Sequence, residues 1–454
     1  MPDELISFFF LEGSRFSKTQ PLACIAHDYN DAPSCSLSAN EFANVRRVFD
    51  DLKIEYMPHI HKDPLENQKQ LARHHIGNAP AGEEHDGFYV VDLGTVITQM
   101  MKWRQHLPMV RPFYAMKCNP NPALLKMLSA MGAGFDCASA PEFMEIVDNK
   151  YASVDDIIFA SPAKQIAHIK KAREVGLKYV TFDNENELIK IAKHWPEAKC
   201  VLRIATNDTK SVCKFSVKFG CPWHHYLHLL AVSRDLGLDI VGVSFHVGSG
   251  CGDTSVHVES AKVARKIFDD GKAFGFQMNL LDIGGGFSGL DNVAVTFQAI
   301  AAELRPYLDT HFGDCRVIAE PGRYFAEPLQ TLVMNVYAKR VLTAEGEQDE
   351  HQYYVTDGVY HSFNCLIFDH AEPKVFPLVP APEARTMTTT MYGPTCDSMD
   401  CIMKRVPFPE VQVGDWLVVP AFGAYTTAAA TSFNGFSTKR FEYTTSVPMV
   451  ECEP

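Results

Sequence analysis

The sequence predicts an α/β protein built from a closed (β/α)8 TIM-like barrel and a C-terminal β-rich domain with a sandwich-like or barrel-like sheet. Eight short β-type segments alternate with segments of helical spacing over about 210 residues. From about Leu329 onward the helical spacing stops, while strand-like segments and turn residues continue. Alternating strands and helices are typical of a parallel sheet, and eight such units at this length favour a closed barrel over an open sheet.

The 454-residue chain divides on this pattern into three segments. Residues 1–87 form an N-terminal extension, part of which we expect to pack on the β-rich domain. Residues 88–328 form the barrel, and residues 329–454 form the β-rich domain. The polar, turn-rich stretch 78–87 is the candidate linker before the barrel.

Residue spacing predicts the individual elements. Residues 36–52 have the apolar spacing of an amphipathic helix, with Ser38 or Asn40 as its N-cap. The barrel strands are short β-type runs that end at or near a turn residue: 113–118, 134–139, 156–161, 179–183, 200–205, 240–248, 280–285 and 317–322. Helical spacing is found between them at 122–131, 142–149, 164–176 and 259–275. The β-rich domain has strand-like runs at 331–338, 352–359, 386–392, 416–420 and 439–447.

Composition excludes several classes of protein. The net charge of −13 argues against a nucleic-acid-binding surface. No run of apolar residues is long enough to predict a membrane-spanning helix, and the start carries Asp3 and Glu4 where a signal peptide would be basic. The 13 cysteines are scattered without a C-x-x-C pair, which argues against a zinc site or a disulfide framework. We therefore expect a cytoplasmic protein with reduced thiols, no resident metal and no membrane partner.

Charged and polar side chains follow the predicted barrel strands, where barrels of this type carry their catalytic groups. The strand ends carry Lys117, Asp136 with Ser139, Arg203, His246 with Ser249, Gly284 to Gly286, and Glu320 with Arg323. One end of the barrel would thus gather a lysine, two carboxylates, a histidine, two arginines and three glycines. Such a set would suit an anionic, carbonyl-type cofactor.

Each of these residues has a functional and a structural interpretation. Lys117 ends an apolar strand, where a lowered pKa would favour Schiff-base formation, although a lysine stem can also lie on apolar surface. Gly284–Gly286 could bring backbone N–H groups to a phosphate, with charge from Arg323, or form a tight turn beside an ion pair. Glu320 could hold a protonated ring nitrogen. His246 is either a satisfied core histidine or a residue stacked on a flat cofactor.

Two downstream residues add weaker signals. Cys396 lies in a Gly/Pro turn beside Asp397, as a proton donor or a loop thiol would. Asp369 could bind a cationic substrate end or cap a turn.

Taken in order, the segments resemble the ornithine decarboxylase family, within the alanine-racemase-type (fold type III) pyridoxal-phosphate decarboxylases. The resemblance covers about Gly87 to Pro448 and implies decarboxylation of L-ornithine to putrescine and CO2, a step of polyamine biosynthesis, by a homodimer with shared active sites. Its motifs are RPFYAMKCNPNP, GFDCASAPE, VLRIATNDTK, SVKFG, VGVSFHVGSGC, LDIGGGFSG, AEPGRYF, DGVYHSFNCLIFDH, YGPTCDSMD and FGAYTTAAATSFNGF.

The resemblance also implies a role for each matching residue. Catalysis would fall to Lys117 as the Schiff-base lysine, Asp136, His246 and Cys396, with Glu142 as a further acid beside the lysine. The residues holding pyridoxal 5′-phosphate would be Lys117, Asp136, Arg203, His246, Ser249, Gly284, Gly285, Gly286, Glu320, Arg323 and Tyr425. The substrate would be bound by Tyr360, Asp369, Asp397 and Phe433. Cys396, which would protonate the carbanion, and Asp397 would come from the partner subunit, and Lys218 and Asp400 would form an intersubunit salt bridge.

Departures from the family pattern leave alternatives open. Phe368 stands where many members carry Tyr, and His361 where Gly is usual, so lysine or arginine decarboxylase of the same class are alternatives. Asp397 after Cys396 disfavours the diaminopimelate type, which usually has Glu there. Residues 164–187 fall where antizyme docks in animals, although a solvated basic helix face looks the same. A non-catalytic, antizyme-inhibitor-like binding protein would have lost cofactor residues, and those residues are present here.

Overall fold

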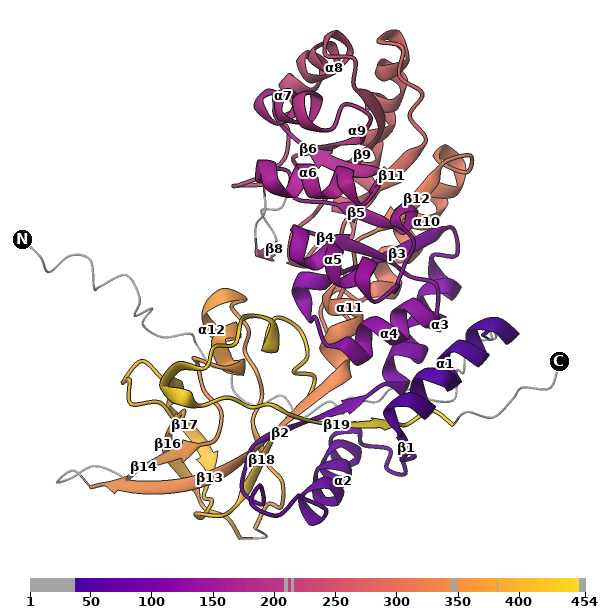
Figure 1. Ribbon diagram of the computed structural model, residues 1–454. Helices are drawn as coiled ribbons and strands as arrows, with labels where there is room; N and C mark the ends of the chain where they lie inside the picture. The colour runs from indigo at the N-terminus through magenta and orange to yellow at the C-terminus, as the bar shows by residue number, and fades with distance from the viewer. Residues whose placement is uncertain (1–36, 208–210, 214–215, 344–348, 382, 449–454) are drawn as a thin grey trace, which may run out of the picture.

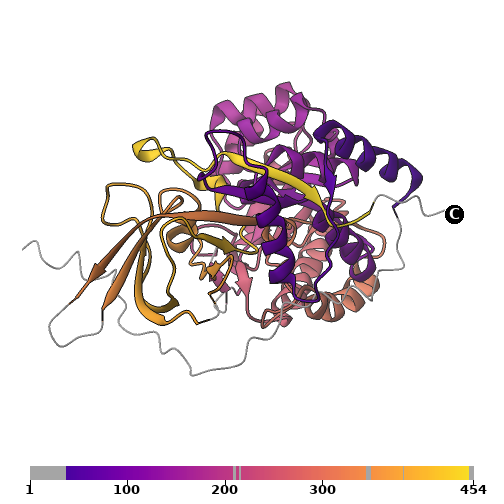
Figure 2. The same cartoon turned by 90° about the horizontal axis from the view of Figure 1, so that it is seen from below.

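The computed structural model describes residues 37–207, 211–213, 216–343, 349–381 and 383–448, and its chain forms two regions that lie side by side (Figures 1 and 2). One region is a barrel surrounded by helices, and the other is built on a long bent sheet. The start of the chain, on which the signal-peptide interpretation depends, lies outside the described residues.

The predicted (β/α)8 barrel is confirmed, because eight parallel strands close on themselves. They are β3 (Val110–Ala115), β4 (Gly134–Cys137), β5 (Ile157–Phe159), β6 (Tyr179–Phe182), β7 (Lys199–Ile204), β9 (Asp239–Phe245), β11 (Leu280–Asp282) and β12 (Arg316–Ala319). A short ladder of β8 (Ser211–Cys213) and β10 (Ser249–Cys251) stands beside it. All eight strands end before the predicted runs do, because the following residues turn into the barrel mouth. Apolar side chains from six of the strands fill the interior as one buried cluster: Phe113, Ile158, Val201, Val241, Leu280 and Ile318.

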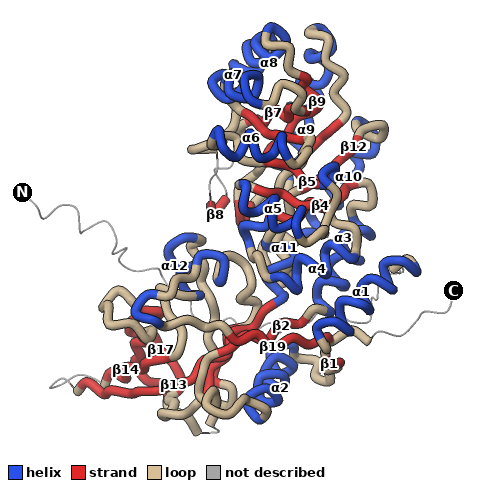
Figure 3. Tube along the Cα trace, viewed as in Figure 1, coloured by secondary structure: helices blue, strands red, loops and turns tan. Residues whose placement is uncertain are grey.

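Helices surround the barrel, as the tube trace shows (Figure 3). They are α3 (Gly94–His106), α4 (Pro122–Ala130), α5 (Ala140–Asp148), α6 (Ile166–Glu174), α7 (Glu185–His194), α8 (Tyr226–Asp235), α9 (Ser255–Ala273), α10 (Phe297–His311) and α11 (Arg323–Ala326). Trp103 on α3 is fully buried and packs against Phe287, Phe297 and Tyr324. This aromatic cluster joins α3 and α10 to the segments that follow β11 and β12, and so supports the strand ends that carry the candidate site.

The β-rich region is a nine-stranded sheet that is mixed rather than purely antiparallel. Its core strand β13 (Gln330–Leu342) pairs with β14 and β18. β14 in turn pairs with β16, and β16 pairs with β17 at the edge of the sheet. The other members are β1 (Glu55–Tyr56), β2 (Phe88–Asp92), β14 (Glu350–Val355), β15 (Phe376–Pro377), β16 (Thr386–Tyr392), β17 (Cys401–Pro409), β18 (Trp416–Val419) and β19 (Arg440–Thr445).

The strand β2 corrects the predicted start of the barrel at residue 88. It pairs antiparallel with β13 and parallel with β19, so it belongs to the β-rich sheet. All five of its residues are buried. A strand buried on both faces has the same apolar appearance in either kind of sheet, and periodicity could not assign it.

The N-terminal extension forms two helices that pack on different regions. In α1 (Ala39–Leu52), Ser38 and Glu41 form a capping box, so Ser38 rather than Asn40 is the cap. Arg104 on α3 donates to Glu41, which fastens α1 to the barrel. The helix α2 (Pro64–Gly77) was not predicted, and it packs on the β-rich sheet. Its sequence signal is Asp63 as the cap followed by proline at the first helical position.

Candidate active site

Lys117 and Asp136 meet at the open end of the barrel. Lys117 lies on the 3-10 turn Met116–Cys118 after β3, and its Nζ donates to Asp136 Oδ2 at 2.8 Å. The two residues come together because β3 and β4 pair with Ala115 opposite Asp136. The Lys117 side chain is 39% exposed, whereas that of Asp136 is 1% exposed. A partly exposed amine is thus held against a buried carboxylate.

The protonation of Lys117 differs from the expectation of a lowered pKa. Loss of solvent lowers its pKa, but the charges of Asp136, Tyr425 and Glu320 raise it by more, and the net result is a pKa above the usual range. The prediction placed Asp136 at the same end of the barrel, but it derived the pKa of Lys117 from the apolar strand alone and left out the charge of that carboxylate. Glu142, close behind, accepts from the Ala138 backbone N–H at 2.5 Å, and burial raises its pKa.

Asp282 and Glu320 form a buried carboxyl pair at the ends of β11 and β12. Asp282 Oδ1 accepts from the Gly284 backbone N–H at 2.9 Å, and the Glu320 N–H donates to the Gly284 carbonyl at 2.7 Å. Burial raises the pKa of Asp282 to about 7 and that of Glu320 well above its usual range, and the Asp136 charge adds to both effects. Their raised pKa values favour one protonated carboxyl in this pair over two adjacent negative charges.

Asp282 is a site residue that the sequence reasoning missed. Asp282 ends the observed strand β11, but it lies inside the longer predicted run 280–285, so it was not among the residues taken from the strand ends. The prediction for this run was based on Gly284–Gly286 instead.

The glycine segment is shaped by two histidines. A Cβ on Gly285 would lie 2.8 Å from His246 Nε2 and 2.8 Å from the Glu320 carbonyl, so the His246 ring lies directly against this backbone. Burial, and then the charges of Arg203 and Lys117, lower the pKa of His246 well below its usual range. His257 on α9 lies behind the segment, stacks on Phe287 at 4.8 Å, and bonds to the Gly285 carbonyl through Nε2 at 3.2 Å.

Arg323 links the predicted phosphate residues to a predicted substrate residue. Its Nε donates to Ser249 Oγ at 2.9 Å, and one terminal nitrogen donates to both oxygens of Asp369 at 2.8 Å. The guanidinium also lies over the Tyr425 ring, 5.3 Å from its centroid. Asp369 ends the short helix α12 (Cys365–Phe368) of the β-rich region. Arg323, predicted to bind the phosphate, and Asp369, predicted to bind the substrate, therefore form an ion pair with each other.

Arg203 stands on β7 with its guanidinium 5.5 Å from the Phe219 ring centroid. Its charge also lowers the pKa of Asp282, although burial of that carboxyl has the larger effect. Arg203 therefore contributes positive charge to the barrel end.

A second cluster forms in the β-rich region from the other predicted substrate and proton-donor residues. The Tyr360 hydroxyl donates to Asp397, and the Tyr360 ring stacks on Phe433 with centroids 4.6 Å apart. The Cys396 N–H donates to Asn434 Oδ1 at 3.1 Å, and the side chain of Cys396 is exposed. Among the described residues, no hydrogen bond or ion pair joins this cluster to Lys117.

The two residues expected to pair between subunits lie in different regions of one chain. Lys218 is in the barrel and stands over the Phe219 ring at 5.0 Å. Asp400 is buried in the β-rich region, where its oxygens accept from the backbone of Val359 and from the backbone and hydroxyl of Thr395. Its carboxylate is therefore already well bonded within the chain.

The described ranges hold neither a cluster of metal-ligating side chains nor a membrane-spanning helix. No three histidine, cysteine, aspartate or glutamate side chains gather there as metal ligands would. No helix in those ranges is long and apolar enough to span a membrane.

Comparison with known proteins relates the barrel to one family. Residues 93–327 match the model for the pyridoxal-binding domain of pyridoxal-dependent decarboxylases. The chain is 43% identical over 438 residues to ornithine decarboxylase of Leishmania donovani, an alignment that covers 82% of this chain and 62% of that protein. It is 44% identical over 386 residues to antizyme inhibitor 2 of Xenopus laevis, covering 83% and 84%.

A solved structure supports the same relation. The arginine decarboxylase of Paramecium bursaria Chlorella virus superposes with a TM-score of 0.77 at 31% identity, and the match covers 83% of this chain and all of that chain.

Proposed function

Because the chain belongs to the pyridoxal-dependent decarboxylase family, we propose that it decarboxylates L-ornithine to putrescine and CO2 in a site completed by a second copy of the chain. The family makes it a lyase that uses pyridoxal 5′-phosphate. The choice of ornithine rests on relatives of that activity at 41–44% identity from protozoan, mammalian, yeast and nematode sources. The observation that carries the proposal is the Lys117–Asp136 pair beside the Asp282–Glu320 pair at one barrel end.

The barrel end fits pyridoxal phosphate on its own geometry. The group needs an amine, an anion site, a partner for its ring nitrogen and a flat wall. Gly285 lets the His246 ring lie directly against the glycine backbone, a contact that a Cβ would prevent. Asp136 Oδ1 and Asp282 Oδ2 are buried and have no hydrogen-bond partner among the described residues. Lys117 supplies the amine, and when bound, the cofactor supplies an electron sink for the pair that CO2 leaves behind.

The carboxyl pair supports a defined charge at the ring nitrogen. Glu320 would face this nitrogen, and the raised pKa values of Glu320 and Asp282 favour one negative charge there rather than two. Asp282 also holds the Gly284 N–H, which ties the charge at the ring nitrogen to the position of the glycine segment. His246 would lie against the opposite part of the cofactor as a neutral ring, since its pKa is lowered.

Arg323 would bind the phosphate with a permanent charge. Ser249 and Asp369 hold its guanidinium from two sides, so it is oriented before any anion arrives. Asp369 would then serve both as the partner that orients Arg323 and as one acceptor for the distal ammonium of the substrate.

The second cluster supports a homodimer with shared sites. Tyr360, Phe433, Cys396 and Asp397 form a patch that carries a thiol and a carboxylate but is not bonded to the Lys117 end of the same chain. Exposed apolar side chains accompany it, with Phe368 at 68% and Met399 at 66%. In the dimer, Cys396 of one subunit would protonate the carbanion in the site of the other, and Lys218 and Asp400 would lie at the same interface.

A cytoplasmic location is part of the proposal. Nine cysteines have side chains that the structure describes; all nine are free thiols, and most of them are buried. Reduced, unpaired cysteines in this number are typical of a reducing compartment.

The similarity to an antizyme inhibitor supports a second candidate, binding of an antizyme. A surface groove between α6 and α7 is lined by Lys170, Arg173, Glu174, Lys193, His194 and Glu197. Its charges are mixed, with Arg173 paired to Glu197, and such a groove would suit a protein partner with charges of both signs. The barrel-end residues favour an enzyme, with or without this partner.

The first test is CO2 release from L-ornithine, L-lysine, L-arginine and meso-diaminopimelate by the full chain supplied with pyridoxal phosphate. We expect strong preference for L-ornithine, and equal amounts of putrescine and CO2. Preference for lysine or arginine would support a decarboxylase but contradict ornithine as its substrate. Absence of both CO2 release and visible cofactor absorbance would leave antizyme binding as the remaining function.

A further inference from the structure

Two chain segments of the β-rich region are joined by a row of hydrogen bonds. We define them as the 357–364 segment and the 426–438 segment. The Thr431 N–H and hydroxyl donate to the Tyr360 carbonyl at 3.0 and 2.9 Å, and Asn364 Nδ2 donates to the Thr426 carbonyl at 2.6 Å. Further along, the Thr438 hydroxyl donates to Asp357 at 2.7 Å. The first segment therefore fixes both ends of the second.

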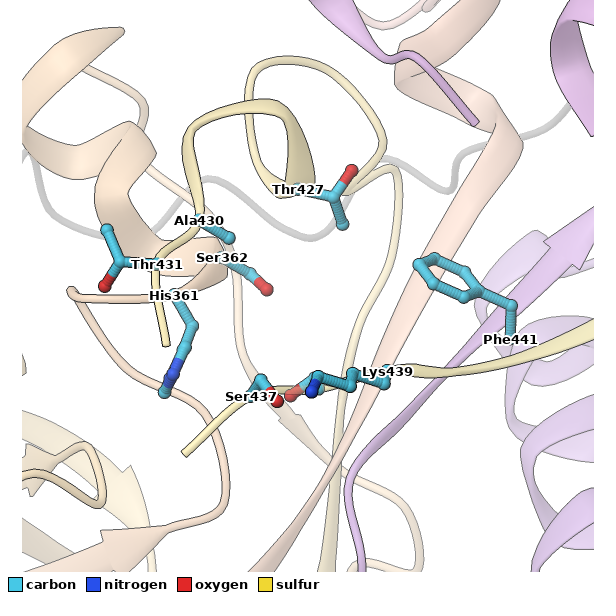
Figure 4. Close-up of a pocket in the computed structure, with 9 residues that line it drawn as sticks. His361, Ser362, Thr427, Ala430, Thr431, Ser437, Lys439 and Phe441 are labelled. Carbon is cyan, nitrogen blue, oxygen red and sulfur yellow. The ribbon is translucent and has the colours of Figure 1, made fainter. Parts of the chain in front are cut away.

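A cavity of about 230 Å³ lies between the two segments (Figure 4). Its walls are mostly hydroxyl-bearing and come from both segments, with Phe441 of β19 on one side. Residues 428–437 are exposed on their outer side. The middle of the 426–438 segment is thus not packed on a core, and its position depends on the few bonds that cross to the 357–364 segment.

His361 makes the crossing bond between those of Thr431 and Thr438. The residue is 1% exposed, and its Nε2 lies 2.5 Å from the Phe436 carbonyl oxygen. A carbonyl can only accept, so Nε2 carries the proton and the imidazole donates. Nδ1 is buried and has no hydrogen-bond partner among the described residues. This ring is therefore held by one donated bond, and that bond reaches the short turn at Phe433–Gly435.

The same turn contacts the residues proposed to meet the substrate. Phe433 stacks on Tyr360, Asn434 accepts from the Cys396 N–H, and Tyr360 donates to Asp397. Any shift of the turn would move the stacking ring and the amide that hold this cluster. We propose that His361 is a positioning residue, which fixes the 426–438 segment through the Phe436 carbonyl and so sets the geometry of Tyr360, Phe433 and Cys396 for the substrate of the other subunit. The inference rests on the proposed function for its catalytic consequence, but the positioning itself does not depend on it.

The test compares His361→Ala and His361→Gln with the unchanged holoenzyme. Glutamine can still donate an N–H to the Phe436 carbonyl, and alanine cannot. The first readout is hydrogen exchange of the backbone N–H groups in residues 431–436, followed by mass spectrometry. The second is the pair of constants kcat and KM for L-ornithine. The third is the visible absorbance of the bound cofactor.

For His361→Ala we expect exchange in residues 431–436 to speed up about tenfold and KM to rise about tenfold, with the cofactor absorbance unchanged. His361→Gln should return both values most of the way. A matched control is His351→Ala, which removes another buried histidine of the same region, bonded to Tyr353 at 3.1 Å, and should leave exchange in residues 431–436 unchanged.

Three outcomes would overturn the inference. Unchanged exchange in His361→Ala would show that other bonds hold the segment. Equal effects of glutamine and alanine would show that the bond to Phe436 is not the cause, and equal effects of His361→Ala and His351→Ala would indicate general destabilisation. If the unchanged enzyme does not turn over ornithine, the proposed function fails, while the exchange data still decide whether His361 positions the segment.

Discussion

The barrel end differs from the second cluster in how the functional side chains are held. This second cluster consists of Tyr360, Phe433, Cys396 and Asp397 and is called the Tyr360 cluster below. At the barrel end, Asp136 on β4 and Asp282 on β11 are buried, and neighbouring backbone groups fix the glycine segment. In the Tyr360 cluster, Cys396 is exposed and Phe433 is 45% exposed on a loop over a cavity. The groups proposed to activate the cofactor are thus preorganised within one chain, whereas the groups proposed to meet the substrate depend on a loop and, in the proposed dimer, on a second copy.

The sharpest way to test the barrel end is Lys117→Ala. The substitution removes the amine that would hold the cofactor, and we expect CO2 release to fall by at least about a thousandfold. The visible absorbance of lysine-bound cofactor should vanish, while the circular dichroism spectrum stays unchanged. As a control, Lys102→Ala removes a lysine paired with Asp291 on the outside of the barrel and should retain activity. Retained absorbance in Lys117→Ala would show that another amine holds the cofactor.

Acid should weaken the barrel end through His257. Burial lowers the pKa of His257 to about 4, so the folded chain resists a proton that the unfolded chain accepts near pH 6.5. The free energy of unfolding carries no His257 penalty above about pH 6.5. It falls by about 3 kcal/mol as the pH drops from there towards 4, because the unfolded chain takes up the proton first. Urea unfolding of the cofactor-free chain at several pH values measures it. The variant His257→Gln should show a shallower loss over this range, and an equal loss in both chains would contradict the assignment.

The Tyr360 cluster can be broken at Cys396. Loss of the proposed proton donor in Cys396→Ala should slow product formation about a hundredfold and misdirect the proton, while the cofactor stays bound. Chromatography of the products beside CO2 release separates the two effects. Mixing Cys396→Ala with Lys117→Ala chains should restore about a quarter of the activity, because half of the dimers then contain one intact site of two. No recovery in the mixture would place Cys396 and Lys117 in the site of the same chain.

The smallest expected effect concerns the ion pair that connects the two regions. Asp369→Asn keeps an oxygen for Arg323 but removes the charge, and we expect the KM for L-ornithine to rise about tenfold. The affinity for pyridoxal phosphate should change less, because Ser249 and Glu327 still contact the guanidinium. Titration of the cofactor absorbance and initial rates measure the two. A larger loss of cofactor affinity than of substrate affinity would assign Asp369 to the phosphate site alone.

Sequence reasoning predicted the parts of the molecule whose signal is contiguous. The eight barrel strands were predicted correctly, and with them the meeting of Lys117 and Asp136, because neighbouring parallel strands end at one edge. What it missed depends on contacts between distant residues. The strand Phe88–Asp92 was given to the wrong sheet, and the Arg323–Asp369 pair joins residues 46 positions apart across two regions. The direction of the Lys117 pKa shift depends on a carboxylate 19 positions away.

The pairing of β19 has a consequence for the order in which the chain folds. β19 lies between β1 and β2, so one edge of the sheet joins residues near 55 and 90 to residues 440–445. During synthesis the barrel strands, residues 110–319, leave the ribosome well before β19 does, and the barrel can close first. Until β19 is made, the backbone N–H and C=O groups on that edge of β2 have no strand to pair with. Such an open edge favours association with other chains. Completion of the sheet is therefore a late step of biosynthesis, and a nascent chain stalled before residue 440 is the form most prone to aggregate.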